Sequence, residues 1–160
     1  MKKKTFNLYV PYSQIFVQDN TIEKYYVSEW NEEEMVDMLS IQKDWLVIGT
    51  VSDMLVPFVL EIVHEEPIFD RQQWDQIVKC SIEIQSGILC LSELENCSTL
   101  EIELPKGLYG VLICYGNLDI DGHYADENGM FGDHYQLTLW KVDKPIPKQV
   151  IKYWANNPEI

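Results

Sequence analysis

The feature that most constrains this chain is a strict alternation of apolar and polar residues. Residues 78–85 carry an apolar side chain at every even position, and residues 99–104 repeat the pattern with Leu100, Ile102 and Leu104. A period of two puts all the apolar side chains on one face of a β-strand, whereas a helix would scatter them around its axis. Both segments are therefore predicted to be half-buried antiparallel strands, in a fold built largely from β-sheet.

Other segments are apolar on both faces, which predicts strands covered by a second layer. Turn signals such as Ser86-Gly87 and Glu95-Asn96 join neighbouring strands into a meander. With 46% hydrophobic residues among 160, the chain can bury one core, so residues 1–160 are expected to form a single domain. The sequence predicts a mainly β protein, an antiparallel β-sandwich of about nine strands, at residues 7–10, 14–18, 45–51, 57–63, 78–85, 88–91, 99–104, 108–115 and 134–142.

Helical signals are confined to two short stretches. Asn31 is a suitable N-cap, acids follow it in the first turn, and apolar residues then recur at helical spacing, which predicts one short helix over residues 32–42. Residues 148–154 are expected to form a short C-terminal helix of one or two turns. The ends of the chain, residues 1–5 and 155–160, are expected to fray.

The excess of acidic residues limits the classes of molecule that the protein can bind. The chain has 12 Lys and Arg against 26 Asp and Glu, a net charge of −14, and seven of the twelve bases lie in or beside the termini. Residues 5–140 contain five Lys or Arg and 24 Asp or Glu, which gives this part of the chain a net charge of −19. Such a body repels phosphates, which excludes direct binding to nucleic acid or an anionic membrane and favours a basic protein partner. No apolar run is long enough to span a membrane, and no targeting segment is recognisable.

The connection over residues 117–133 is the strongest candidate for a binding surface, because long loops of this kind are commonly functional. We predict an acidic, aromatic finger that contacts a protein partner. A calcium-binding loop is the alternative, although the spacing of its acids does not fit an EF-hand. A second alternative is a solvated loop without a binding role, in which Met130 and Phe131 pack against the sheet edge. The candidate partner-binding residues are Asp119, Asp121, His123, Tyr124, Asp126, Glu127, Phe131 and Asp133.

No pattern for catalysis or for a cofactor is present in the sequence. The three histidines lie beside no nucleophile motif, and no glycine-rich phosphate loop exists. The four cysteines, separated by 10, 7 and 17 positions, match no zinc or redox spacing and suit free thiols in a reducing compartment. We therefore expect a cytoplasmic protein that is not an enzyme and holds no metal or cofactor.

The order of several short motifs resembles a known family. An aromatic strand pair at residues 8–17 precedes Trp30-Asn31-Glu32-Glu33, and Leu104-Pro105-Lys106-Gly107-Leu108-Tyr109 comes later, before the closing strand at residues 135–140. Over residues 6–142 the chain resembles the competence protein ComJ family, whose members include an inhibitor of a DNA-entry nuclease. The resemblance implies a small bacterial protein that binds and inhibits a nuclease; no site residue is transferred from it.

Two other functions remain open from the sequence. The protein could be an immunity protein that neutralises a different basic toxin, since the acidic composition would serve equally well. It could instead be a β-sandwich that binds a small ligand or carbohydrate through aromatic side chains. The candidate residues for that function are Tyr115, Tyr124, Trp140 and Trp154.

Overall fold

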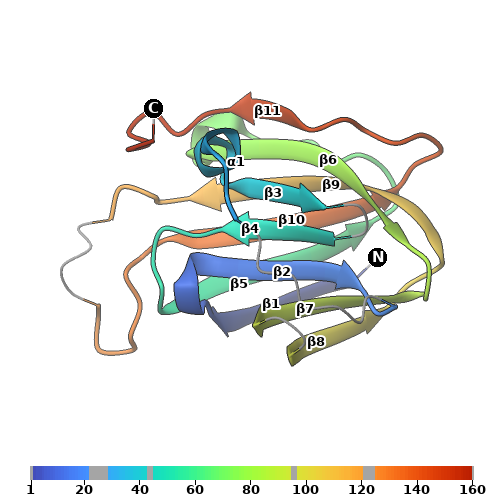
Figure 1. The fold of residues 1–160 in the computed structure, drawn as a ribbon, viewed down its shortest axis with the longest axis horizontal. Helices are drawn as coiled ribbons and strands as arrows, with labels where there is room; N and C mark the ends of the chain where they lie inside the picture. Colours follow the sequence, from blue (N-terminus) through green and yellow to red (C-terminus); the bar gives the residue numbers. More distant parts are fainter. Residues whose placement is uncertain (1, 22–28, 43–44, 95–96, 121–124, 160) are drawn as a thin grey trace.

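The computed structural model describes residues 2–21, 29–42, 45–94, 97–120 and 125–159. The described chain is mainly β, with eleven strands in two sheets and one short α-helix (Figure 1). The prediction of a mainly β protein with one short helix is confirmed, and the strands exceed the nine predicted by two. The elements are β1 (Lys2–Tyr9), β2 (Gln14–Asp19), α1 (Glu32–Asp37), β3 (Leu39–Gln42), β4 (Trp45–Gly49), β5 (Leu55–Val63), β6 (Gln76–Ile84), β7 (Ile88–Leu94), β8 (Cys97–Glu103), β9 (Gly107–Gly116), β10 (His134–Lys141) and β11 (Gln149–Lys152).

The two sheets differ in size and in strand direction. The six-stranded sheet has the order β1-β5-β10-β9-β6-β11, and the five-stranded sheet has the order β3-β4-β2-β7-β8. Neighbouring strands are antiparallel except β5 and β10, which pair in parallel with Phe58 opposite Tyr135. Both strands are interior strands of the larger sheet, which is where a parallel pair can be covered on both faces.

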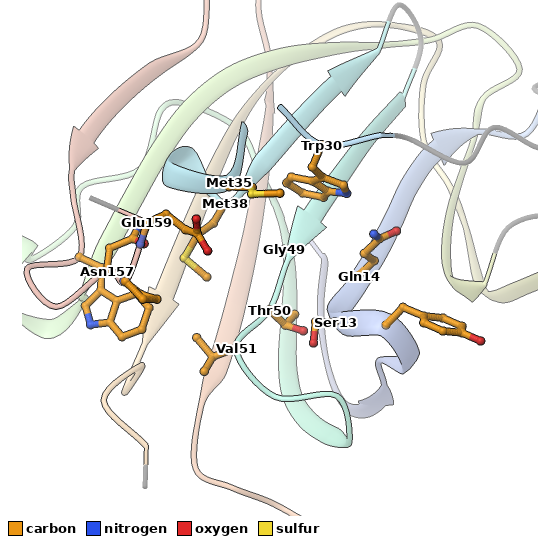
Figure 2. A pocket seen from close by; sticks show the side chains of 13 residues that line it. Ser13, Gln14, Trp30, Met35, Met38, Gly49, Thr50, Val51, Asn157 and Glu159 are labelled. Carbon is orange, nitrogen blue, oxygen red and sulfur yellow. The ribbon is translucent and has the colours of Figure 1, made fainter. Parts of the chain in front are cut away.

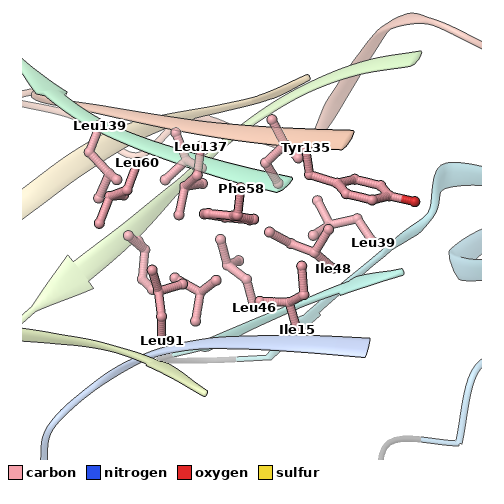
Figure 3. Close-up of a cluster of buried hydrophobic side chains, with 14 of the residues drawn as sticks. Ile15, Leu39, Leu46, Ile48, Phe58, Leu60, Leu91, Tyr135, Leu137 and Leu139 are labelled. Atoms are coloured by element: carbon pink, nitrogen blue, oxygen red, sulfur yellow. The ribbon is translucent and has the colours of Figure 1, made fainter. Parts of the chain in front are cut away.

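One hydrophobic core joins the two sheets. Figure 3 shows side chains of β5 and β10 pointing toward those of β2, β3, β4 and β7. Phe58, Ile15 and Leu137 have no exposed surface. Tyr115 and Tyr135 are also fully within this core, and their rings meet edge to face with centroids 5.8 Å apart. The alternating segments therefore bury their apolar face as the sequence predicts.

A second apolar cluster covers the outer face of the larger sheet. Ile77, Leu112, Cys114 and Trp140 are buried there beneath partly buried side chains of the segments before β6 and after β10. Trp140 lies across the backbone of its partner Gly110, where a Cβ would collide with the indole ring. Strand β9 is consequently covered on both faces, which explains its unbroken apolar sequence.

The predicted helix over residues 32–42 is too long. Helix α1 ends at Asp37, because Met38 adopts a left-handed conformation with φ of 58°, and residues 39–42 form edge strand β3. The left-handed residue breaks the helix and redirects the chain into the smaller sheet. Leu39, which fits a helical spacing, is instead a buried strand residue.

Three further features differ from what the sequence predicts. Lys2–Tyr9 is a strand paired with β5 along its whole length, where residues 1–5 are predicted to fray. Residues Gln149–Lys152 form strand β11 beside β6 in place of a C-terminal helix. The turn at Ser86-Gly87 does not join paired strands, since β6 and β7 belong to different sheets. The predicted meander therefore holds only for β7 and β8.

Candidate functional site

A pocket of about 510 Å³ opens where the turn before β2, helix α1 and the C-terminal segment meet (Figure 2). Its walls are largely apolar, and its mouth carries the exposed side chains of Tyr12 and Met35. The lining residues are Tyr12, Ser13, Gln14, Trp30, Met35, Met38, Gly49, Thr50, Val51, Trp154, Asn157, Pro158 and Glu159.

Unusual backbone conformations shape this pocket. Tyr12, Ser13 and Met38 have positive φ values of 60°, 57° and 58°. In the described chain the other residue of this kind, glycine aside, is Asn117. Residues other than glycine adopt this region at an energetic cost, and such residues concentrate at functional sites. Most of the strained backbone in the described chain therefore lies around one pocket.

Helix α1 is fixed at both ends, which holds the pocket wall in place. Asn31 and Glu34 form a capping box at its start, with distances of 2.8 Å and 3.0 Å. At its end the Gln76 amide donates to the carbonyl oxygens of Val36 and Asp37, at 3.2 Å and 2.6 Å. A buried strand residue thus satisfies carbonyl groups that a short helix leaves unpaired.

The C-terminal segment forms the opposite wall. The Trp154 backbone N–H donates to the Gln76 side chain at 3.0 Å, and the Trp154 indole N–H donates to Asp119 at 2.7 Å. Asn157 is buried, although residues 155–160 were expected to fray, and its amide donates to the Val36 carbonyl oxygen at 2.9 Å. These bonds tie the C-terminal wall to α1 and to the 117–133 loop.

The two tryptophans of the pocket are held differently. Trp154 is anchored by hydrogen bonds, whereas the Nε1 atom of Trp30 is buried and has no hydrogen-bond partner among the residues that the structure describes. The far edge of the Trp30 ring lies over Gly49, where an added Cβ would be in ordinary van der Waals contact with it. Trp30 therefore contributes apolar surface to the wall and no polar contact.

Acidic groups adjoin the pocket. A second hollow of about 410 Å³ is lined by Glu32, Glu33, Val36, Asp37, Tyr153 and Glu159, and Glu159 lines both. Lys148 forms ion pairs with Asp37 and with Glu33, the latter at 3.1 Å. Burial alone would lower the pKa of Lys148, but its hydrogen bonds to Asp37 and Glu33 outweigh burial and raise that pKa above 10.5. Lys148 therefore stays protonated and partly neutralises the charges of Asp37 and Glu33.

The predicted loop residues have several different environments. Asp119 is exposed and accepts hydrogen bonds from Trp154 and, at 3.0 Å, from Asn156. The Asp126 carboxylate caps its own turn by accepting the backbone N–H groups of residues 128 and 130. Glu127 is exposed and Phe131 is half-buried. Asp121, His123 and Tyr124 lie outside the described residues.

Asp133 differs from the other predicted loop acids because it has no exposed surface. Its carboxylate accepts hydrogen bonds from the Ser52 backbone N–H and hydroxyl, at 3.1 Å and 2.8 Å, and from the Tyr135 hydroxyl at 2.5 Å. Burial, followed by the charge of Asp133, raises the pKa of Tyr135 well above 10, which keeps this hydroxyl protonated as a donor. Asp133 therefore joins the end of the loop to Ser52 and Tyr135 by buried hydrogen bonds, and its side chain is not accessible to a partner in this structure.

The aromatic residues considered for ligand binding are mostly structural. Tyr115 and Trp140 are buried in the two apolar clusters, and Tyr124 lies outside the described residues. Only Trp154 of this set lines the pocket. The sequence analysis missed Tyr12, Trp30 and Met35 as site residues. Their signals were weak: a Pro-Tyr-Ser break between two strands, and apolar residues flanking a helix start.

Clustered metal ligands and reactive thiols are two features typical of a catalytic site, and both can be checked in the described residues. Within these ranges, no group of three His, Cys, Asp or Glu side chains is placed to hold a metal ion. Burial raises the pKa of the Cys80 and Cys114 thiols to about 12, so neither is a nucleophile at neutral pH. No helix among the described residues has the length and hydrophobicity needed to cross a membrane.

The fold belongs to the class of mainly β proteins with two sheets, and in this chain an apolar hollow flanked by acids opens at one end. Within that class the fold is that of ComJ, the inhibitor of the DNA-degrading activity of NucA from Bacillus subtilis, with a TM-score of 0.67 at 15% sequence identity, covering 88% of this chain and 98% of ComJ. The protein of the crocagin biosynthetic gene J is also similar, with a TM-score of 0.61 at 18% identity, covering 89% and 100%. No protein-family model and no curated protein sequence matches the chain.

Proposed function

We propose that this protein inhibits a DNA-degrading nuclease by binding it. The observation that carries the proposal is the likeness to ComJ, which extends over almost all of both chains. The negative charge of −14 supports it, because nucleases present cationic surfaces to DNA and an acidic protein is steered toward them.

Inhibition of this kind needs complementary surfaces and no chemistry. Carboxylates of the inhibitor take the place of DNA phosphates on the basic surface of the enzyme, and apolar contacts supply much of the affinity. The protein acts as a folded domain over residues 1–160 that occupies the DNA-binding cleft. The exposed acids of the 117–133 loop and of α1 are the candidates for the steering charges.

The test is a DNA-degradation assay with the purified protein titrated against NucA and against purified basic nucleases of the organism that carries this gene. We expect at least one nuclease to lose its activity near a molar ratio of one, with weaker inhibition as salt rises. Poly-glutamate at equal charge is the control for a non-specific polyanion effect. The proposal would be contradicted if every nuclease kept its full activity when this protein was present in molar excess.

A further inference from the structure

We propose that the pocket between Tyr12 and Trp154 receives an apolar side chain that a basic protein partner presents between Lys or Arg residues. This inference rests on the proposed function, because it names the part of the surface that would contact the nuclease. The observation behind it is the meeting of an apolar hollow, exposed apolar side chains at its mouth and acids beside it.

The mouth of the pocket supplies the first argument. Tyr12 is 84% exposed and Met35 is 43% exposed, although both are large apolar side chains. Tyr12 belongs to the turn before β2 and Met35 belongs to α1, so two different elements bring these side chains to one hollow. Exposed apolar groups gathered at a cavity mark a binding surface, whereas scattered ones do not. The pocket volume of about 510 Å³ also lies in the range of ligand-binding sites.

Charge argues for a basic occupant. The residues that line the pocket and the adjoining hollow include Glu32, Glu33, Asp37 and Glu159, with no Lys or Arg among them. Lys148, the cation paired with Glu33 and Asp37, offsets only part of this charge. An apolar small molecule would gain nothing from the acids. A protein segment that combines an apolar side chain with cations uses both features.

Rigidity argues for a site formed before binding. The Gln76 side chain links the end of α1 to Trp154, and Asn157 links the C-terminal turn to Val36. A wall held by such bonds loses little conformational entropy when it is occupied. The strained backbone at Tyr12 and Ser13 projects the Tyr12 ring at the mouth, where a partner would cover it.

The first experiment changes the mouth and leaves the fold intact. In Tyr12→Asn the new residue tolerates positive φ, and in Met35→Gln the new residue keeps the length and helix propensity. We expect the double variant to inhibit the nuclease about tenfold more weakly, with an unchanged melting temperature. The matched control is Ile68→Asn, which removes a fully exposed apolar side chain outside the pocket. Equal inhibition by the double variant and the control would overturn the proposal.

A second experiment does not depend on any nuclease. Methionine methyl NMR spectra are recorded while acetyl-Lys-Phe-Lys-amide, acetyl-Lys-Ala-Lys-amide or acetyl-Glu-Phe-Glu-amide is added at millimolar concentration. We expect the Met35 and Met38 signals to shift with the first peptide and to shift several-fold less with the other two. Equal shifts with the Glu-flanked peptide would identify a site for apolar small molecules, and no shift would exclude a side-chain pocket. Either result would overturn the proposal and would leave nuclease inhibition to its own assay.

Discussion

At the scale of single residues, backbone conformation decides where strands begin. Gly107 opens β9 with a φ of 145°, a conformation that L side chains rarely adopt. A Cβ there would also lie 2.6 Å from the Lys141 ammonium, which donates to the Lys106 carbonyl oxygen at 2.7 Å. This Leu-Pro-Lys-Gly segment is one of the motifs on which the family resemblance rests, and in the structure it forms the turn before β9. The need for glycine follows from the turn geometry.

Replacing this glycine should therefore destabilise the fold. We expect Gly107→Ala to lower the free energy of unfolding by about 1 to 3 kcal/mol, the usual cost of such backbone strain. Urea unfolding measures the change. Gly49→Ala is the matched control, because Gly49 has no positive φ and an added Cβ would make only ordinary contacts. Equal free energies of unfolding for the two variants would contradict the conclusion that position 107 requires glycine.

The buried carboxylate of Asp133 gives a second prediction at this scale. Asp133→Asn should cost about 2 kcal/mol or more, because an amide group cannot accept all of the hydrogen bonds from Ser52 and Tyr135, and a buried donor is then left unsatisfied. Thermal unfolding checks this loss. Glu127→Gln, which changes an exposed acid of the same loop, should leave the melting temperature unchanged.

At the scale of elements, the alternating strands were predictable, whereas edge strands β3 and β11 were not. Residues 78–85 have one obvious pattern, and β6 buries it as expected. Residues 32–42 contain Met35, Met38 and Leu39 at helical spacing, but the left-handed Met38 turns the last four residues into a strand. Its conformation depends on tertiary hydrogen bonds from Tyr115 and Gly49 to its carbonyl oxygen. Contacts so distant in sequence leave no local pattern, so the pocket that they shape could not be predicted either.

The crossing from β6 to β7 depends on a titratable group, which gives a prediction for acid stability. Asp19 at the end of β2 accepts hydrogen bonds from the Ser86 backbone N–H and hydroxyl, at 3.0 Å and 2.7 Å. Burial alone would raise its pKa, but the hydrogen bonds from Thr21 and Ser86 outweigh burial and hold the pKa of Asp19 below 3.8. The ionised carboxylate therefore stabilises the fold at every pH above 3.8, and this contribution is lost as the pH falls through the lower, folded-state value.

Asp19→Asn should consequently be less stable than the parent protein at pH 7, by about 1.5 to 3 kcal/mol, the usual worth of hydrogen bonds to a charged group. The difference should shrink when the pH falls below 3.8. Urea unfolding of both proteins between pH 7 and pH 3 measures it. A difference that stays constant down to pH 3 would show that the charge of Asp19 makes no contribution.

At the scale of the whole molecule, one edge strand of each sheet is linked to the other, and the candidate binding surfaces lie at the opposite end. Lys2 at the start of β1 donates to the Glu103 carbonyl oxygen of β8 at 2.6 Å, which links one edge of each sheet. Helix α1 and the C-terminus lie toward the other end (Figure 1). The pocket is lined by residues of both, and Asp119 contacts Trp154 beside it. Edge strand β1 begins with Lys2, Lys3 and Lys4, and charged side chains of this kind disfavour strand pairing at that edge. A partner is therefore expected to bind through side chains at the opposite end.

The last prediction identifies which exposed acids steer that partner. Asp126→Asn together with Glu127→Gln removes two exposed loop charges, and the side-chain oxygen of the introduced asparagine can still accept the turn hydrogen bonds. We expect slower association with the inhibited nuclease and a weaker dependence of that rate on salt, because surface charges act on the encounter and are screened within about 8 Å at physiological ionic strength. Stopped-flow association at several salt concentrations measures both effects. The control is Glu101→Gln with Glu103→Gln, which removes two exposed charges from β8. If only Glu32→Gln with Glu33→Gln slows association, the acids of α1 steer the partner and the loop does not.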